Sequence, residues 1–170
     1  YDILFFWVAR MILMTTFMIR EVPFKTVYLH GLVRTRDGKK MSKSDPLTCI
    51  DPLESIRDYG TDALRLALIQ GTGPGQDLRL YPEKLESCRR FANKVWNAGR
   101  YILMNIPSGT SLDPPQNVQN EAARWLLHEL DLLIGKTRQG LEAFRLSEVI
   151  DNLRSFFWGT FCDWYLEMDK

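Results

Sequence analysis

The most constraining feature of this chain is an almost uninterrupted apolar run near its start. The run extends from Ile3 to Ile19 and contains one charged residue, Arg10. A helix that is apolar on nearly all sides is stable in a globular protein only when several of its sides are buried. A charge at the centre and a length of 17 residues, at the short limit for crossing a bilayer, argue against a membrane span. We therefore predict a buried core helix over residues 2–19.

The composition is that of an ordinary globular protein. Apolar residues make up 45% and charged residues 25% of 170 residues, and the net charge is +1. These values exclude a disordered tail, a collagen-like repeat and a disulfide-stabilised miniprotein. Both ends continue in helical, partly apolar sequence instead of fraying into polar residues. We therefore expect the chain to be a piece of a larger protein.

Three cysteines lie far apart in the sequence, at Cys49, Cys88 and Cys162. No CxxC pair or other zinc-ligand spacing is present, so we expect no protein-bound metal in this segment. A sparse, odd number of cysteines is typical of a reducing compartment, which predicts a cytoplasmic protein.

The first half of the chain has a mixed α/β pattern. A β-branched and aromatic stretch predicts a strand over residues 25–30, and Asp37-Gly38 predicts a tight hairpin turn between residues 32–36 and 39–41. Asp51 followed by Pro52 indicates a helix start, and two helices are expected, over residues 52–59 and 61–70. The glycine-rich loop at residues 71–75 is a weak candidate for a phosphate cradle, because no strand leads into it.

The second half is predicted to be helical throughout. A 3.6-residue apolar period predicts a long helix over residues 82–105. Residues 107–120 are rich in Pro, Ser, Gly and Asn and form the one convincing linker. Two amphipathic helices follow, over residues 121–140 and 147–169. The predicted fold class is therefore α/β followed by all-α.

The densest basic run covers residues 34–43, with five cations and one anion. Lys40 and Lys43, with the hydroxyls of Ser42 and Ser44, form a cationic loop just before a helix. Ammonium groups and loop hydroxyls suit the oxygens of a polyphosphate. The alternative is a solvated surface turn, and charge alone does not decide between them.

The sequence of this loop resembles a signature motif of a known protein family. Lys40-Met-Ser-Lys-Ser44 is identical to the KMSKS signature of class I aminoacyl-tRNA synthetases. Around it, stretches similar to the subgroup that charges valine, isoleucine and leucine are His30-Gly-Leu-Val-Arg34, Ile50-Asp-Pro-Leu53 and Tyr59-Gly-Thr-Asp-Ala-Leu-Arg65. Stretches that closely resemble the valyl-tRNA synthetases are Asp2-Ile-Leu-Phe-Phe-Trp-Val-Ala-Arg-Met11, Gly73-Pro-Gly-Gln-Asp77, Arg90-Phe-Ala-Asn-Lys-Val-Trp-Asn97 and Phe161-Cys-Asp-Trp-Tyr-Leu-Glu-Met168. The matches span nearly the whole chain in the family's order.

The resemblance implies a domain organisation. Residues 1–80 would be the C-terminal half of a Rossmann-type nucleotide-binding catalytic domain, with its KMSKS loop. Residues 81–120 would be a connecting helix and linker, and residues 121–170 the truncated start of a helical anticodon-binding domain. Neither the half with the family's HIGH motif nor its editing domain is matched.

The resemblance also implies an activity and its site residues. The family activates an amino acid with ATP, which carries Mg²⁺, and transfers the aminoacyl group to tRNA, here valine to tRNA(Val). Lys40 and Lys43 would stabilise the negative charge that develops on the phosphates. The residues implied to bind ATP are His30, Gly31, Lys40, Met41, Ser42, Lys43, Ser44 and Asp2, although Asp2 suits a helix N-cap equally well.

Two further groups of residues are implied to bind valine and tRNA. Ile3 and Trp7, four residues apart, would line the amino-acid pocket; spacing alone favours core packing. Residues 81–104 carry five basic and two acidic residues, and the candidates for tRNA backbone contact are Arg89, Arg90, Lys94 and Arg100. The alternatives are a solvated helix face for this group and a structural role for Lys94.

The loop after KMSKS departs from the family's pattern. The family's Gly-Asn or Asn-Asn pair after KMSKS is replaced by Asp45-Pro-Leu-Thr-Cys-Ile50, in which proline stiffens the loop and Asp45 places an anion beside Lys43.

Two alternative interpretations of the chain remain, an isoleucyl- or leucyl-type relative and a non-catalytic module that binds tRNA or nucleotide. We expect the full-length protein to be monomeric and the isolated segment to be inactive.

Overall fold

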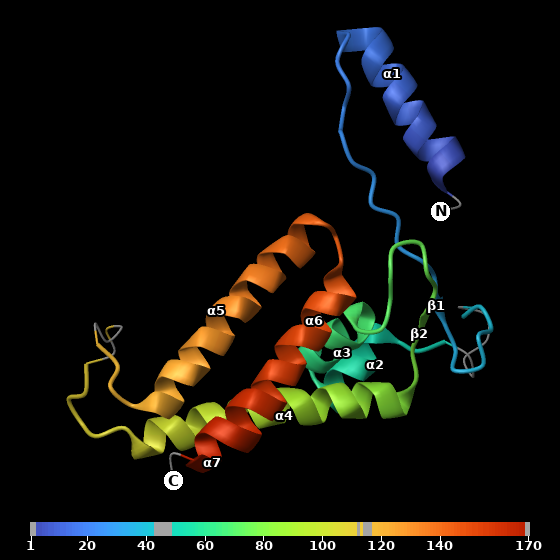
Figure 1. The fold of residues 1–170 in the computed structure, drawn as a ribbon. Helices are drawn as coiled ribbons and strands as arrows, with labels where there is room; N and C mark the ends of the chain where they lie inside the picture. Colours follow the sequence, from blue (N-terminus) through green and yellow to red (C-terminus); the bar gives the residue numbers. More distant parts are fainter. Residues whose placement is uncertain (1–2, 43–48, 112, 114–116, 169–170) are drawn as a thin grey trace.

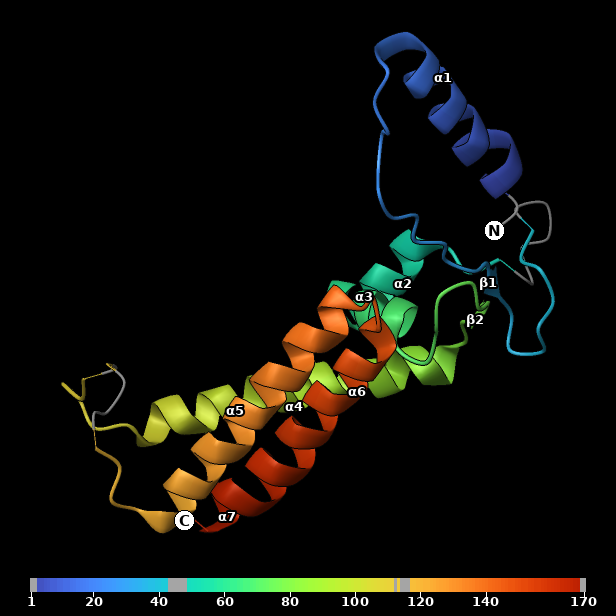
Figure 2. The same ribbon diagram turned by 45° about the horizontal axis from the view of Figure 1, so that its top comes forward.

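The computed structural model describes residues 3–42, 49–111, 113 and 117–168. Its elements in chain order are the π-helix η1 (Leu4–Val8), α1 (Ala9–Ile19), β1 (Val33–Arg34), α2 (Pro52–Tyr59), α3 (Thr61–Ile69), β2 (Leu78–Arg79), α4 (Pro82–Asn105), α5 (Glu121–Glu142), α6 (Leu146–Ser155), the π-helix η2 (Phe156–Tyr165) and α7 (Leu166–Met168). Figures 1 and 2 show a helical body built on α4, with α1 standing apart from it. The described part of the chain is therefore mainly helical.

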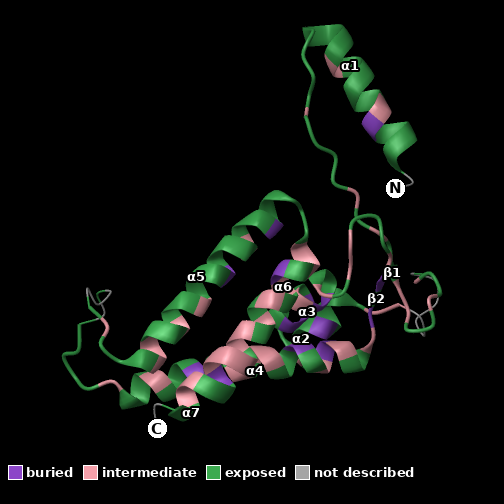
Figure 3. Cartoon of the chain, in the orientation of Figure 1, coloured by how far each residue is buried: buried purple, intermediate pink, exposed green. Residues whose placement is uncertain are grey.

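The N-terminal helix forms where it was expected, but the prediction that it is buried is wrong. Its large apolar side chains are mostly exposed, Phe5 to 80%, and Val8 is the buried exception. Figure 3 shows this exposure along α1, and Figure 1 shows the extended chain that joins the helix to the body. The apolar sequence of this helix predicts that its side chains should be buried. Burial also needs a second surface to cover them, and the helical body does not provide one.

The strand expected over residues 25–30 is not formed. These residues are extended, and the amide of Gly75 donates a hydrogen bond of 2.8 Å to the carbonyl of Leu29. The sheet that the structure describes has two short parallel strands, with Val33 opposite Leu78 and Arg34 opposite Arg79. A β-branched segment becomes a strand only when a neighbouring backbone completes its ladder.

The helices α2 and α3 begin and end where their capping residues predict. The side chain of Asp51 accepts a hydrogen bond of 2.7 Å from the amide of Leu53, and Pro52 occupies the first turn. Gly60, with a φ of 92°, separates the two helices. A buried core then joins α3 to α4 and consists of Ala63, Leu64, Ala67, Leu80, Leu85 and Cys88.

The C-terminal helices pack on α4 through aromatic side chains. Phe91 on α4 contacts Phe157 edge-on at 6.0 Å and stacks with Trp158 at 6.4 Å between ring centroids. The expected single helix over residues 147–169 is divided into α6, η2 and α7, and along η2 Phe161 lies 5.5 Å from Phe157 and 6.0 Å from Tyr165. The described residues of the predicted linker, 107–120, form no helix or strand.

The helices α5 and α6 form an antiparallel pair (Figure 1). A Cβ added at Gly140 on α5 would lie 2.5 Å from Cγ2 of Val149 on α6. Glycine at this position therefore allows the two helices to approach closely.

Candidate functional site

The predicted hairpin is formed, and it brings Lys40 to its end. The amide of Gly38 donates to the carbonyl of Thr35 at 3.0 Å, and the amide of Thr35 donates to the carbonyl of Lys39 at 2.9 Å. Gly38 has a φ of 81°, which a glycine adopts without strain, and Arg34 pairs with Lys40 across an antiparallel bridge. The local sequence thus builds a rigid turn directly before the signature.

The signature itself is described in part. Lys40 and Ser42 lie at the surface side of the hairpin's exit, and Met41 packs against the core between α3 and α4. Lys43 and Ser44 lie outside the described residues, as does Asp2.

A carboxylate directly before the strand β2 holds the base of this hairpin. Oδ1 of Asp77 accepts a hydrogen bond of 2.8 Å from the amide of Leu32, and Oδ2 forms an ion pair with Nε of Arg34. The amide of Leu32, first, and then the Arg34 guanidinium hold the pKa of the Asp77 carboxyl below its ordinary value. The group is therefore ionised at neutral pH.

Arg34 contacts the turn as well as the strand. Its Nη1 donates to the carbonyl of Gly38 at 3.3 Å. One guanidinium thus joins Asp77, beside β2, to the tip of the hairpin that ends at Lys40. The planar fork of donors in arginine suits two acceptors in different directions.

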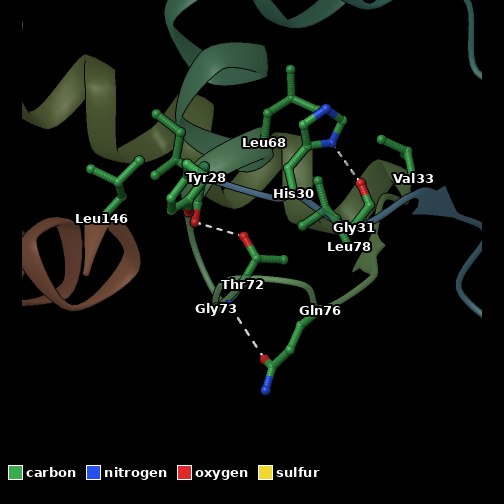
Figure 4. A pocket seen from close by; sticks show the side chains of 11 residues that line it. Tyr28, His30, Gly31, Val33, Leu68, Thr72, Gly73, Gln76, Leu78 and Leu146 are labelled. Carbon is green, nitrogen blue, oxygen red and sulfur yellow. Dashed lines mark hydrogen bonds between the residues drawn. The ribbon is translucent and has the colours of Figure 1, made fainter. Parts of the chain in front are cut away.

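His30 and Gly31 line a cavity of about 280 Å³ between the extended chain, α3 and the start of α6. Figure 4 shows them opposite Thr72 and Gln76, with Tyr28 and Leu146 at the other side. Nδ1 of His30 lies 2.9 Å from the carbonyl oxygen of Gly31, within hydrogen-bond distance. The cavity combines an apolar wall with a few polar groups, an arrangement typical of small-molecule sites.

Gly31 has a steric role besides any contact with ligand. A Cβ at this position would lie 2.0 Å from the carbonyl oxygen of Gln76 and 2.6 Å from the amide nitrogen of Asp77. Both atoms belong to the backbone and cannot rotate away. The absence of a side chain at Gly31 therefore allows the two segments to meet.

The predicted valine-pocket residues lie on the N-terminal helix. Ile3 and Trp7 are 52% and 58% exposed. The guanidinium of Arg10 lies over the Trp7 ring at 5.3 Å from its centroid. Ile3 directly precedes η1 and Trp7 lies within it, and their role in binding valine stays a prediction.

Two of the predicted tRNA-contact residues share one acidic partner on α4. Nε of Arg89 lies 2.9 Å from Glu86, and Nε of Arg90 lies 3.1 Å from the same carboxylate. The two guanidinium groups, Arg89 first, lower the pKa of Glu86. This carboxylate offsets part of the positive charge that a phosphate backbone would meet.

Lys94 is engaged within the protein. Its Nζ lies 3.1 Å from Oδ1 of Asp163 and 4.4 Å from the centroid of the Trp158 ring, both on η2. These contacts fit the structural alternative that its position beside the apolar stripe suggested. Arg100 is exposed near the C-terminal end of α4.

Sequence reasoning assigns no role to Asp77, although the stretch Gly73–Asp77 carries part of the resemblance. It also assigns no role to Gln70, at the end of α3, whose side chain contacts Arg154 on α6. No local pattern marks either contact, because the partners are 43 and 84 residues apart.

Metal-ligand clusters and membrane-spanning helices are both absent from the described residues. None of their His, Cys, Asp and Glu side chains gather in groups of three or more that could bind a metal ion. None of their helices combines the length and the apolar character that spanning a membrane requires.

Two protein families match successive parts of the chain. Residues 1–81 match the tRNA synthetases class I (I, L, M and V), and residues 123–170 match the anticodon-binding domain of tRNA ligase. A solved ternary complex of a LeuRS from Agrobacterium radiobacter K84 with tRNA and LeuAMS has the same fold over 85% of this chain and 19% of that chain, with a TM-score of 0.72 and 23% identity.

Curated relatives match the chain from end to end. A valine–tRNA ligase from Dehalococcoides mccartyi (strain CBDB1) is 48% identical over 170 residues, and one from Clostridium tetani is 46% identical over 172 residues. The matches include 100% of this chain and 19% of each relative, so the chain spans about a fifth of their length. On these matches the chain belongs to the class I aminoacyl-tRNA synthetases, in the group that comprises the isoleucine, leucine, methionine and valine enzymes.

Proposed function

We propose that this chain is part of a valine–tRNA ligase that activates valine with ATP and transfers it to tRNA(Val). The observation that carries the proposal is the identity of 45–48% to proteins named valine–tRNA ligase over the whole chain. Within the proposal, residues 1–80 are the C-terminal half of the Rossmann-type catalytic domain. Residues 81–120 connect it to the first helices of the anticodon-binding domain, residues 121–170.

The hairpin geometry supports the first chemical step. The carboxylate of valine attacks the α-phosphorus of ATP, an adenylate forms and pyrophosphate leaves. Negative charge grows on the phosphate oxygens in this transition state, and a cation placed there lowers the barrier. Lys40 at the exit of the hairpin, and Lys43 three residues further on, are the proposed cations. Mg²⁺ enters with ATP as part of the substrate.

The remaining site assignments follow the same proposal. His30 and Gly31, beside the 280 Å³ cavity, and Met41 are proposed to lie next to the adenosine. Ile3 and Trp7 are proposed to select valine by the size of the space between them. Arg89, Arg90 and Arg100 are the proposed contacts with the tRNA backbone, whereas Lys94 is held by Asp163. A cytoplasmic location and a monomeric full-length enzyme belong to the proposal as well.

The test is valine-dependent exchange of pyrophosphate into ATP, measured on the longer ligase that contains this segment. We expect exchange with valine at a far lower KM than with isoleucine or leucine. Exchange driven best by isoleucine or leucine would assign the chain to a neighbouring specificity. ATP or tRNA binding without exchange with any of the three would indicate the non-catalytic module. The isolated 170 residues should show no exchange.

A further inference from the structure

The side chains of Arg34 and Arg36 connect the hairpin before Lys40 to the rest of the protein. Arg34 joins the carboxylate of Asp77 to the carbonyl of Gly38 in the turn. Arg36 pairs with Glu83 at 2.7 Å, and its guanidinium lies over the ring of Tyr81 at 5.4 Å. Apart from Gly38, the partners of both arginines lie between Asp77, directly before β2, and Glu83 in the first turn of α4.

The two anchors differ in strength. The side chains of Arg34 and Asp77 are 28% and 25% exposed, whereas those of Arg36 and Glu83 are 66% and 63% exposed. Exposed ion pairs contribute little to rigidity, because water screens them and the side chains lose freedom when they pair. Asp77 in addition accepts a hydrogen bond from the amide of Leu32, so its two oxygens bind two points of the segment that leads into the hairpin. The Arg34–Asp77 pair is therefore the principal anchor.

We infer that Asp77 and Arg34 are positioning residues for adenylate formation, because they fix the hairpin that presents Lys40 to the phosphates. The inference rests on the proposed function. Neither residue needs to touch ATP: Asp77 orients Arg34, Arg34 holds the carbonyl of Gly38, and the turn holds the backbone of Lys39 and Lys40. A cation that stabilises charge on a moving phosphate oxygen is effective only when it is held in place beforehand.

The role predicts an effect confined to one step. Adenylate formation requires Lys40 near the phosphates, whereas transfer of valine from preformed adenylate to tRNA begins after pyrophosphate has left. A defect in positioning should therefore slow the first step and spare the second. A general loss of folding would slow both.

The experiment uses the full-length ligase with Asp77→Asn, Arg34→Lys and the double variant. Asn keeps an oxygen for the amide of Leu32 but loses the ion pair, and Lys keeps the charge but lacks the second arm that reaches Gly38. Glu148→Gln is the matched control, because Glu148 pairs with Arg145 at 3.4 Å at the start of α6, away from the hairpin. Valine-dependent exchange, single-turnover transfer from isolated enzyme-bound adenylate, and hydrogen exchange at the amides of residues 35–39 are measured for each.

We expect both single variants to lower kcat for exchange by roughly ten- to a hundredfold, the range for a displaced catalytic group. The KM for valine and the transfer rate should change less than about twofold, the amides of Thr35 and Gly38 should exchange faster, and the double variant should be no worse than the singles. Unchanged exchange kinetics or unchanged amide protection in Asp77→Asn would overturn the inference. Equal slowing of both steps would also overturn it, since it would show a structural role only.

Failure of the inference and failure of the proposed function are distinguishable. If the wild-type ligase shows no valine-dependent exchange, the proposed function is wrong, and the catalytic part of the inference falls with it. If the wild type is active and Asp77→Asn is as active as Glu148→Gln, the proposed function stands and the inference is overturned.

Discussion

Nη1 of Arg154 donates a hydrogen bond of 3.1 Å to Oε1 of Gln70, which ties α6 directly to the end of α3. Further contacts converge on the same point. Nη2 of Arg154 donates to Ser87 at 3.3 Å, its guanidinium lies over the Phe91 ring at 5.3 Å, and Nζ of Lys84 donates to the carbonyl of Gln70 at 2.8 Å. The C-terminal helices are thus joined to the first half of the chain by a polar cluster as well as by aromatic packing.

Replacing Arg154 should loosen this junction. We expect Arg154→Met to lower the free energy of unfolding by about 1–3 kcal/mol, because Oε1 of Gln70 loses a charged donor in a half-buried position. Urea unfolding followed by tryptophan fluorescence measures the change. Arg145→Met, which removes an exposed pair with Glu148, is the control and should change the free energy by less than about 0.5 kcal/mol. Equal effects of the two variants would argue against the junction.

The close approach of α5 and α6 gives a second prediction. Gly140→Ala should destabilise the chain by about 1–3 kcal/mol, because the new Cβ meets Val149 and forces the helices apart. Gly135→Ala on the same helix has no atom within 4 Å of the new Cβ and should stabilise by roughly 0.5–1 kcal/mol. In a Val149→Ala background the penalty at Gly140 should shrink. If both glycine variants changed the melting temperature in the same direction, the steric explanation would be wrong.

Gly31 gives a sharper steric prediction. Gly31→Ala should destabilise by at least about 3 kcal/mol, the upper range of overpacking, because the new Cβ would meet the backbone of Gln76 and Asp77. Gly99→Ala in α4, where nothing lies within 4 Å, is the matched control. If Gly31 acts through ligand contact alone, the variant should unfold at the wild-type urea concentration and lose only ATP affinity.

The ion pair and hydrogen bond at Asp77 should depend on pH in a defined direction. The folded state lowers the pKa of this carboxyl from its ordinary 3.8, so its contribution to stability is fully present above that value. The contribution is lost as the pH falls through the lowered pKa. The amide shift of Leu32, followed by NMR, should therefore titrate with a midpoint below 3.8, and the titration should vanish in Asp77→Asn. A midpoint at or above 3.8 would falsify the assignment.

The cation at the end of the hairpin should act on the transition state. In the proposed full-length ligase, Lys40→Ala should slow exchange by roughly a hundredfold, or about 3 kcal/mol, with little change in the KM for valine. Lys136→Ala, an exposed lysine on α5, serves as the control and should leave the rate unchanged. A Lys40 variant with wild-type kcat would remove this residue from the proposed mechanism.

Several elements were predictable because their causes are local. The cap at Asp51, the break at Gly60 and the turn at Gly38 each depend on the conformational preference of one residue and on partners within a few positions. The long helix α4 follows in the same way from its apolar period, and it ends where predicted, at Asn105. The KMSKS motif could be recognised for a different reason, because its residues are contiguous in the sequence.

The expectations that failed depend on partners that are distant in the sequence. The segment 25–30 has the composition of a strand, but only one backbone hydrogen bond reaches it from residues 71–76. The helix α1 has the pattern of a buried helix, yet its apolar faces remain open. The pattern of apolar residues predicts which face of a segment can be buried. It does not predict whether another segment packs against that face.

The limits of α2, α3 and α4, the cap at Asp51, the hairpin and the resemblance to a synthetase family could be predicted from the sequence, since hydrogen bonds between near neighbours and an unbroken motif carry that information. The pairing of Asp77 with Arg34, of Gln70 with Arg154 and of Lys94 with Asp163 depends on how the helices and strands pack in three dimensions. Such pairs form when the chain brings residues 43 to 84 positions apart together, and the free energy that selects them comes from the packing of whole helices.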